Sequence, residues 1–147
     1  MDLNFGKKYK DFTKEVKDFC KKYKGIHFID SSKVPLSGSF KSGEIKMTRS
    51  DWQKILIEKG YFARSIPSEY GGYGGESDII KSRIIAEEFA KSKIPPPMGG
   101  QGIDMLVPTL LELGTEEQKQ KYIKPTLHGE IIWCQGYSEP NAGSDLA

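Results

Sequence analysis

The residues best suited to chemistry form a short polar turn, residues 138–145, with the sequence SEPNAGSD. Its proline fixes one backbone dihedral, and Asn141 tolerates a left-handed conformation. Gly143 lets a ligand approach the backbone closely, and the hydroxyls of Ser138 and Ser144 lie at the two ends of the turn. Exposed backbone N–H groups in such a turn can bind an anion. The residues therefore allow a phosphate-binding turn, and they also fit an ordinary loop after a strand.

A strand is predicted directly before this turn. Residues 131–137, with the sequence IIWCQGY, are rich in β-branched and aromatic side chains, which is typical of strands. The helical periodicity of the preceding chain stops at Gly129. We therefore expect a helical region up to residue 130, followed by one strand that presents the turn at its end.

The first helix is indicated by a stripe of apolar side chains at intervals of three or four residues: Phe5, Tyr9, Phe12, Val16, Phe19 and Tyr23. This is the period of one helix face, and Gly25 is a suitable end. We interpret the stripe as a surface that faces the core, and we expect no cofactor role for its rings. Residues 26–47 are rich in Ser, Gly and Pro and are expected to be irregular.

A second helix is predicted to begin after Thr48, which can cap its first turn, and to end at Gly60. A third is predicted from Ser77 to Ala90, with a buried side made of Ile80, Ile84, Ala86 and Phe89. The adjacent Glu87 and Glu88 are expected to be solvated.

A fourth helix is predicted over residues 103–113, with a kink or a restart at Pro108. Thr115 and Gln118 have the spacing of a capping box, which predicts a short helix over residues 119–123. The glycine-rich loop over residues 71–75 lacks the GxGxxG spacing of a dinucleotide site, so it is interpreted as a set of tight turns.

Composition limits the function classes. The formal net charge is +2, and the many lysines of the first helix alternate with acidic residues, which indicates a solvated face and no nucleic-acid surface. Cys20 and Cys134 have no metal-ligand spacing and are expected to be reduced thiols, although one disulfide is conceivable. No apolar run is long enough to span a membrane, and the first residues lack a secretory signal, so a cytoplasmic location is expected.

The end of the chain resembles a known family. Residues 133–147, with the sequence WCQGYSEPNAGSDLA, look like the first signature of the acyl-CoA dehydrogenases, in which an aromatic-rich strand precedes a (Ser/Thr)-Glu-Pro-x-Ala-Gly-Ser-Asp turn. Upstream, residues 52–60, the loop over residues 67–72 and the segment over residues 114–130 resemble that family in order and spacing. The first 47 residues fit only as a generic leading helix and variable loop.

The resemblance implies a mainly α fold: an amino-terminal helical bundle of the acyl-CoA dehydrogenase type over residues 1–130, and the start of a truncated FAD-binding β-domain over residues 131–147. It also implies a set of cofactor-binding residues for FAD: Gln135, Tyr137, Ser138, Gly143 and Ser144. Ser138 would donate to the pyrimidine edge of the flavin, and Ser144 would bond the pyrophosphate and also touch the acyl-CoA substrate. Glu139 and Asp145 are interpreted as holding the turn.

The implied reaction is α,β-dehydrogenation of an acyl-CoA thioester, with electrons passed to an electron-transferring flavoprotein. In this family the catalytic base lies late in the chain, so no catalytic residue is assigned here and the isolated chain is expected to be inactive. A homo-oligomer or a complementary fragment is the expected partner. Two alternatives stay open: a fragment of an acyl-CoA oxidase or flavin monooxygenase of the same superfamily, and a non-catalytic helical interaction module.

Overall fold

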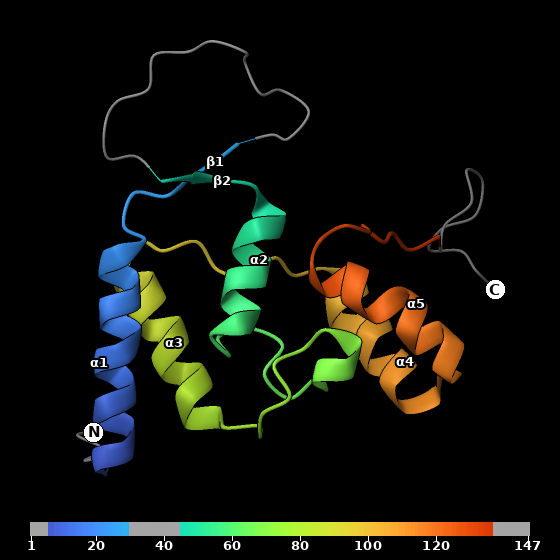
Figure 1. Cartoon of the computed structure of the whole chain (residues 1–147), viewed down its shortest axis with the longest axis horizontal. Helices are drawn as coiled ribbons and strands as arrows, with labels where there is room; N and C mark the ends of the chain where they lie inside the picture. The colour runs from blue at the N-terminus through green and yellow to red at the C-terminus, as the bar shows by residue number, and fades with distance from the viewer. Residues whose placement is uncertain (1–5, 30–44, 137–147) are drawn as a thin grey trace, which may run out of the picture.

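The computed structural model describes residues 6–29 and 45–136 (Figure 1). Its elements, in chain order, are α1 (Lys7–Lys22), β1 (His27–Phe28), β2 (Lys46–Met47), α2 (Arg49–Glu58), η1 (Ser68–Tyr70), α3 (Ile79–Ser92), η2 (Gly102–Leu106), α4 (Val107–Leu113) and α5 (Glu116–Leu127). The described part is therefore mainly helical, which confirms the predicted fold class.

The aromatic stripe of α1 lies in a core shared with α2 and α3. α1 and α3 run side by side at one end of the molecule (Figure 1). The ring of Phe19 stacks on Phe89 with centroids 5.9 Å apart and on Trp52 at 5.7 Å. Val16 is fully buried in the same cluster. From Tyr9 to Tyr23 the stripe is a core surface, as predicted, because its side chains fill the space between three helices. Phe5 lies outside the described residues.

A second core joins α4, α5 and η1 at the opposite end of the molecule (Figure 1). Ile123 and Leu127 of α5 are fully buried there, together with Val107 of α4. α2 lies between the two cores, since its Leu56 packs in the first cluster and its neighbour Ile57 packs in the second. α2 is therefore the element that couples the two halves of the described structure.

Helix capping follows the sequence closely. Thr48 and Thr115 each form a capping box, with Asp51 and Gln118 respectively. The predicted restart at Pro108 is confirmed, because the π-helical segment η2 gives way to α4 one residue earlier.

Three details of α3 differ from the prediction. Asp78, and not Ser77, caps the helix, because its carboxylate accepts from the backbone N–H groups of Ile80 and Lys81. Ala86 is exposed. Glu88 was expected to be solvated but is buried, with Lys91 Nζ 3.0 Å from its carboxylate, and this ion pair makes burial of the charge possible.

α5 was predicted to end at residue 123 but continues through Pro125 to Leu127. Burial of Ile123 and Leu127 on one face holds the helical register across the proline. The proline carbonyl then accepts from the backbone N–H groups of Glu130 and Ile131 and closes the helix.

The strand predicted over residues 131–137 is not formed over the described residues 131–136, which pair with no other strand. A strand requires a neighbour that supplies ladder hydrogen bonds, and the described chain offers none at this place. A parallel pair was not predicted: β1 and β2 align His27 with Lys46 and Phe28 with Met47. The domain boundary after residue 130 stays a prediction.

Within residues 6–29 and 45–136, no helix has the length and apolar character required to cross a membrane. The same residues contain no cluster of His, Cys, Asp or Glu suited to a metal ion. Cys20 is buried and Cys134 is exposed, and the two are not paired with each other.

Candidate functional site

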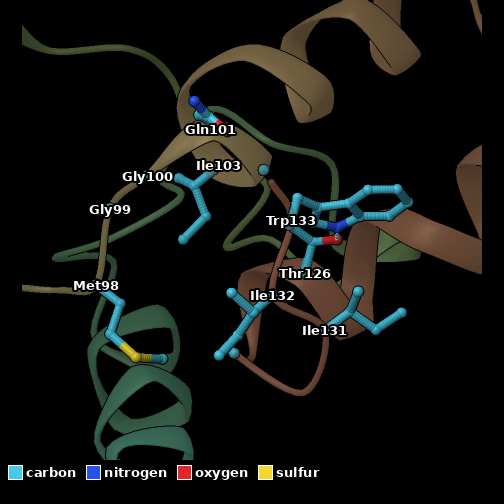
Figure 2. Close-up of a pocket in the computed structure, with 11 residues that line it drawn as sticks. Met98, Gly99, Gly100, Gln101, Ile103, Thr126, Ile131, Ile132 and Trp133 are labelled. Atoms are coloured by element: carbon cyan, nitrogen blue, oxygen red, sulfur yellow. Dashed lines mark hydrogen bonds between the residues drawn. The ribbon is translucent and has the colours of Figure 1, made fainter. Parts of the chain in front are cut away.

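A small pocket lies where the chain leaves α5 and passes the loop that leads into η2 (Figure 2). Its volume is about 100 Å³. Three segments line it: Met98 to Ile103, the end of α5 with Gly129, and Ile131 to Trp133. The lining is dominated by aliphatic, aromatic and glycine residues, which is typical of a site for an apolar group.

One wall of the pocket is Trp133. Its indole Nε1–H donates to Thr126 Oγ1 at 2.9 Å, and its ring lies edge-on to Tyr122 with centroids 5.6 Å apart. The ring also lies against Gly102, where a Cβ atom would collide with it. A glycine at the start of η2 is therefore required for this ring position.

The opposite wall is Met98, which Figure 2 shows across the pocket from Trp133. Its backbone N–H donates to the Gln53 side-chain oxygen at 2.8 Å. Its methyl group lies against Gly129, where a Cβ would collide with it, and Gly129 also has a φ of +69°. Both the backbone conformation and the close approach require glycine at this position.

The mouth of the pocket is polar. Gln101 donates from its side-chain nitrogen to the Gln135 side-chain oxygen at 3.1 Å, and both residues are exposed. Next to them, the Asp104 carboxylate accepts from the Gly100 backbone N–H at 2.8 Å. This bond holds the glycine turn that leads into η2.

Ionisable groups flank Gly129 at the end of α5. His128 is 3.6 Å from the Glu130 carboxylate, which also binds Lys54 at 3.2 Å. Burial lowers the pKa of His128 from its ordinary value, although the nearby carboxylate partly opposes this. The hydrogen bond from Lys54 lowers the pKa of Glu130. At neutral pH, His128 is therefore neutral and Glu130 is ionised.

Among the described residues that line the pocket, none carries a carboxylate, an imidazole, a thiol or an amine. The described lining therefore lacks a general base, and the hydroxyl of Thr126 is engaged in a hydrogen bond to the Tyr122 carbonyl at 2.6 Å. What these side chains can do is hold an apolar group and orient it through the two amides at the mouth.

Of the predicted site residues, Gln135 lies at this mouth. Tyr137, Ser138, Gly143 and Ser144 lie outside the described residues. Sequence reasoning missed Met98, Gln101 and Gly129 as pocket residues. The available signal was the GGQG run over residues 99–102, which Met98 separates from three prolines, since closely spaced glycines allow a neighbouring chain to approach the backbone.

Comparison with known families gives a match over residues 7–130 to the model described as "Acyl-CoA dehydrogenase, N-terminal domain". The chain belongs to the acyl-CoA dehydrogenase family. Its described fold is the amino-terminal helical domain of that family.

Individual relatives of the chain are also acyl-CoA dehydrogenases. The chain is 38% identical over 112 residues to acyl-CoA dehydrogenase IpdE1 of Mycolicibacterium smegmatis, covering 76% of this chain and 28% of that protein. It is 29% identical to glutaryl-CoA dehydrogenase of Desulfococcus multivorans, covering 99% of this chain and 35% of that one. The chain thus spans about a third of the length of these curated relatives.

Solved structures show the same fold. The ChsE4-ChsE5 complex from Mycobacterium tuberculosis superposes with a TM-score of 0.58 at 23% identity, covering 99% of this chain and 34% of that one. The steroid acyl-CoA dehydrogenase Tcur3481-Tcur3483 gives a TM-score of 0.54 at 25% identity, with coverage of 99% and 35%.

Proposed function

We propose that this chain supplies the helical part of an FAD-dependent acyl-CoA dehydrogenase that carries out α,β-dehydrogenation of acyl-CoA thioesters. The observation that carries the proposal is the position of the pocket. Trp133, in its wall, and Gln135, at its mouth, belong to the same segment that leads into the signature turn. An apolar acyl chain in the pocket would therefore lie beside the segment that precedes the turn in the sequence.

The described residues next to the turn suit a large planar cofactor. Gln135 and Gly136 are exposed, and nothing lies within 4 Å of a Cβ built at Gly136. We propose that FAD binds here, with Gln135 and Tyr137 beside the isoalloxazine and with Gly143 and Ser144 at the pyrophosphate. FAD, when bound, supplies the acceptor for the β-hydride.

Each chain residue has a binding role in this proposal. The hydroxyl of Ser138 donates to the pyrimidine edge of the flavin, where negative charge develops on reduction. The glycine at position 143 leaves room for the pyrophosphate beside the backbone. Ser144 binds the pyrophosphate and contacts the acyl-CoA chain.

The general base is expected to come from elsewhere in the complete enzyme. The pocket lining has no carboxylate, and Glu88, the buried carboxylate of α3, is paired with Lys91 in the first core. The isolated chain is therefore proposed to be inactive. Its partners would be the remaining part of the enzyme, in an oligomer, and an electron-transferring flavoprotein as acceptor. The cytoplasmic location stays a prediction.

Reconstitution tests the proposal. The chain would be co-expressed with a second polypeptide that carries the rest of the β-domain and the late helical domain, and turnover of acyl-CoA would be followed with an artificial electron acceptor. We expect turnover from the pair and none from either piece. A pair that assembles and binds FAD but oxidises no acyl-CoA would contradict the proposed reaction and favour a non-catalytic role.

A further inference from the structure

Gln53 is an unusual core residue, since a side-chain amide is fully buried at the centre of α2. Its nitrogen donates to the Leu127 carbonyl at 3.0 Å, and its oxygen accepts from the Met98 backbone N–H at 2.8 Å. The two bonds reach across 74 and 45 residues of sequence. One planar side chain therefore joins two distant backbone segments.

Both segments need such a partner. Leu127 is the last residue of α5, where carbonyl groups lack a helical partner. Met98 follows three prolines, which have no N–H of their own to anchor the segment. Each backbone group would be costly to bury unpaired, and a side-chain amide satisfies a donor and an acceptor at once.

The same two segments form the pocket. Met98 is one wall, and the end of α5 leads directly to Gly129, against which the Met98 methyl group lies. The preceding residue of α2 acts on the same loop, because Trp52 Nε1–H donates to the Pro95 carbonyl at 3.0 Å. α2 thus holds the loop of residues 95–98 at both ends.

We propose that Gln53 is a positioning residue that sets the separation between the Met98 wall and the wall formed at the end of α5. Its side chain is not among the residues that line the pocket. The expected effect of Gln53 on acyl binding rests on the proposed function. Its expected effect on the separation of the two walls does not.

The test uses the 147-residue chain labelled with ¹³C-methyl methionine. Gln53→Leu removes both hydrogen bonds and replaces the amide with an apolar side chain of similar size. The matched control is Gln120→Leu, since Gln120 is exposed on α5 and bonds only within that helix. The readouts are the Met98 methyl signal, the Trp133 indole N–H signal and, as an internal reference, the methyl of Met47, which packs against the first core.

In Gln53→Leu we expect the Met98 and Trp133 signals to shift or broaden while the Met47 signal stays in place, and we expect no change in the control. Gln53→Glu offers a rescue, because burial raises the pKa of a carboxyl group and the protonated form supplies both a donor and an acceptor. Its Met98 signal should return toward the unmodified position as the pH is lowered. Equal changes at Met47 and Met98, or none at either, would overturn the proposal.

A second measurement needs no variant. The Met98 amide proton of the unmodified chain should exchange with solvent at least about ten times more slowly than in an unstructured peptide, because Gln53 holds it. Exchange at the unprotected rate would overturn the positioning role, whether or not Gln53→Leu folds.

The effect of Gln53 on acyl binding is measured in a separate experiment. Titration with octanoyl-CoA should move the Met98 methyl signal in the unmodified chain, and Gln53→Leu should weaken this binding about ten-fold or more. If octanoyl-CoA does not move the Met98 methyl signal of the unmodified chain, the acyl site of the proposed function loses support. The Met98 and Trp133 signals of Gln53→Leu still decide the role of Gln53.

Discussion

At the scale of single residues, the glycines of the pocket are more informative than its large side chains. Gly102 and Gly129 leave the space that Trp133 and Met98 occupy. Because protein interiors are closely packed, a methyl group at either position would force one wall to move. The pocket therefore depends on residues that contribute no functional group.

Gly129→Ala tests this dependence. The variant should lose about 2 kcal/mol of unfolding free energy, because φ is positive there and the new Cβ meets Met98. Urea unfolding measures the loss. Gly136→Ala is the control, since its Cβ would enter open space, and its stability should match that of the unmodified chain. Equal stability of both variants would show that the Met98 contact is not maintained.

Ser138→Ala tests the proposed flavin contact in the reconstituted enzyme. Fold stability should change by on the order of 1 kcal/mol or less, since a polar turn loses one hydroxyl. The flavin reduction potential should fall, because a donor to the reduced flavin is lost. A spectroelectrochemical titration gives the potential. An unchanged potential together with unchanged turnover would show that Ser138 does not contact the flavin.

At the scale of elements, α5 contributes Thr126 to the pocket and is anchored at both of its ends. Its amino terminus is capped by Thr115 and tied to η1 by the hydrogen bond from Tyr70 to Glu116, at 2.8 Å. Its carboxyl terminus carries His128 and precedes Gly129. Changes at either end are therefore expected to reach the pocket through the helix.

Thr115→Ala removes the cap of α5 and should cost about 1 kcal/mol of unfolding free energy. Thr109→Ala is the matched control, because the Thr109 hydroxyl only bonds back to Met105 within exposed helix, and it should change stability by less than about 0.5 kcal/mol. Chemical denaturation of both variants measures the difference. Equal losses of unfolding free energy in the two variants would mean that the capping box does not stabilise the chain.

His128 should make stability depend on pH. Its pKa is lowered in the folded chain, so the unfolded chain takes up a proton more readily. This contribution is complete above the ordinary histidine pKa and is lost as pH falls through that value toward the lower folded pKa. His128→Gln should therefore flatten the decline in stability between about pH 7 and pH 5. Urea midpoints across this range test it, and parallel declines in both proteins would contradict it.

At the scale of the whole molecule, the described helices form two cores joined by α2. The pocket opens beside the second core, next to the segment that leads into the signature turn. The chain spans about a third of its curated relatives. We propose that the flavin site draws on surface beyond these two cores.

The isolated chain is accordingly expected to bind FAD weakly or not at all, because the turn supplies one wall of a site and binding requires most of the surface to be preorganised. Fluorescence titration with FAD measures this. Stoichiometric yellow protein at micromolar affinity would be the contrary result, and it would place the flavin site within these 147 residues.

Local signals in the sequence were sufficient for most of the helices. The periodic stripe of α1, the cap at Thr48 and the capping box at Thr115 were confirmed, because a helix face and a helix cap depend on residues a few positions apart. Where the sequence failed, a distant contact decided the outcome. α5 continues through Pro125 because Ile123 and Leu127 are buried against other elements, and residues 131–136 form no strand because no described segment pairs with them.

The sequence by itself therefore determined the helical class and the family resemblance, both of which are encoded in short stretches of chain. Only the tertiary structure brought Met98, Gly102, Gly129 and Trp133 together. Only the tertiary structure showed that Gln53 joins Met98 to Leu127. The physical reason is that a buried amide is stabilised by the particular backbone groups it meets, and no local pattern specifies which groups those will be.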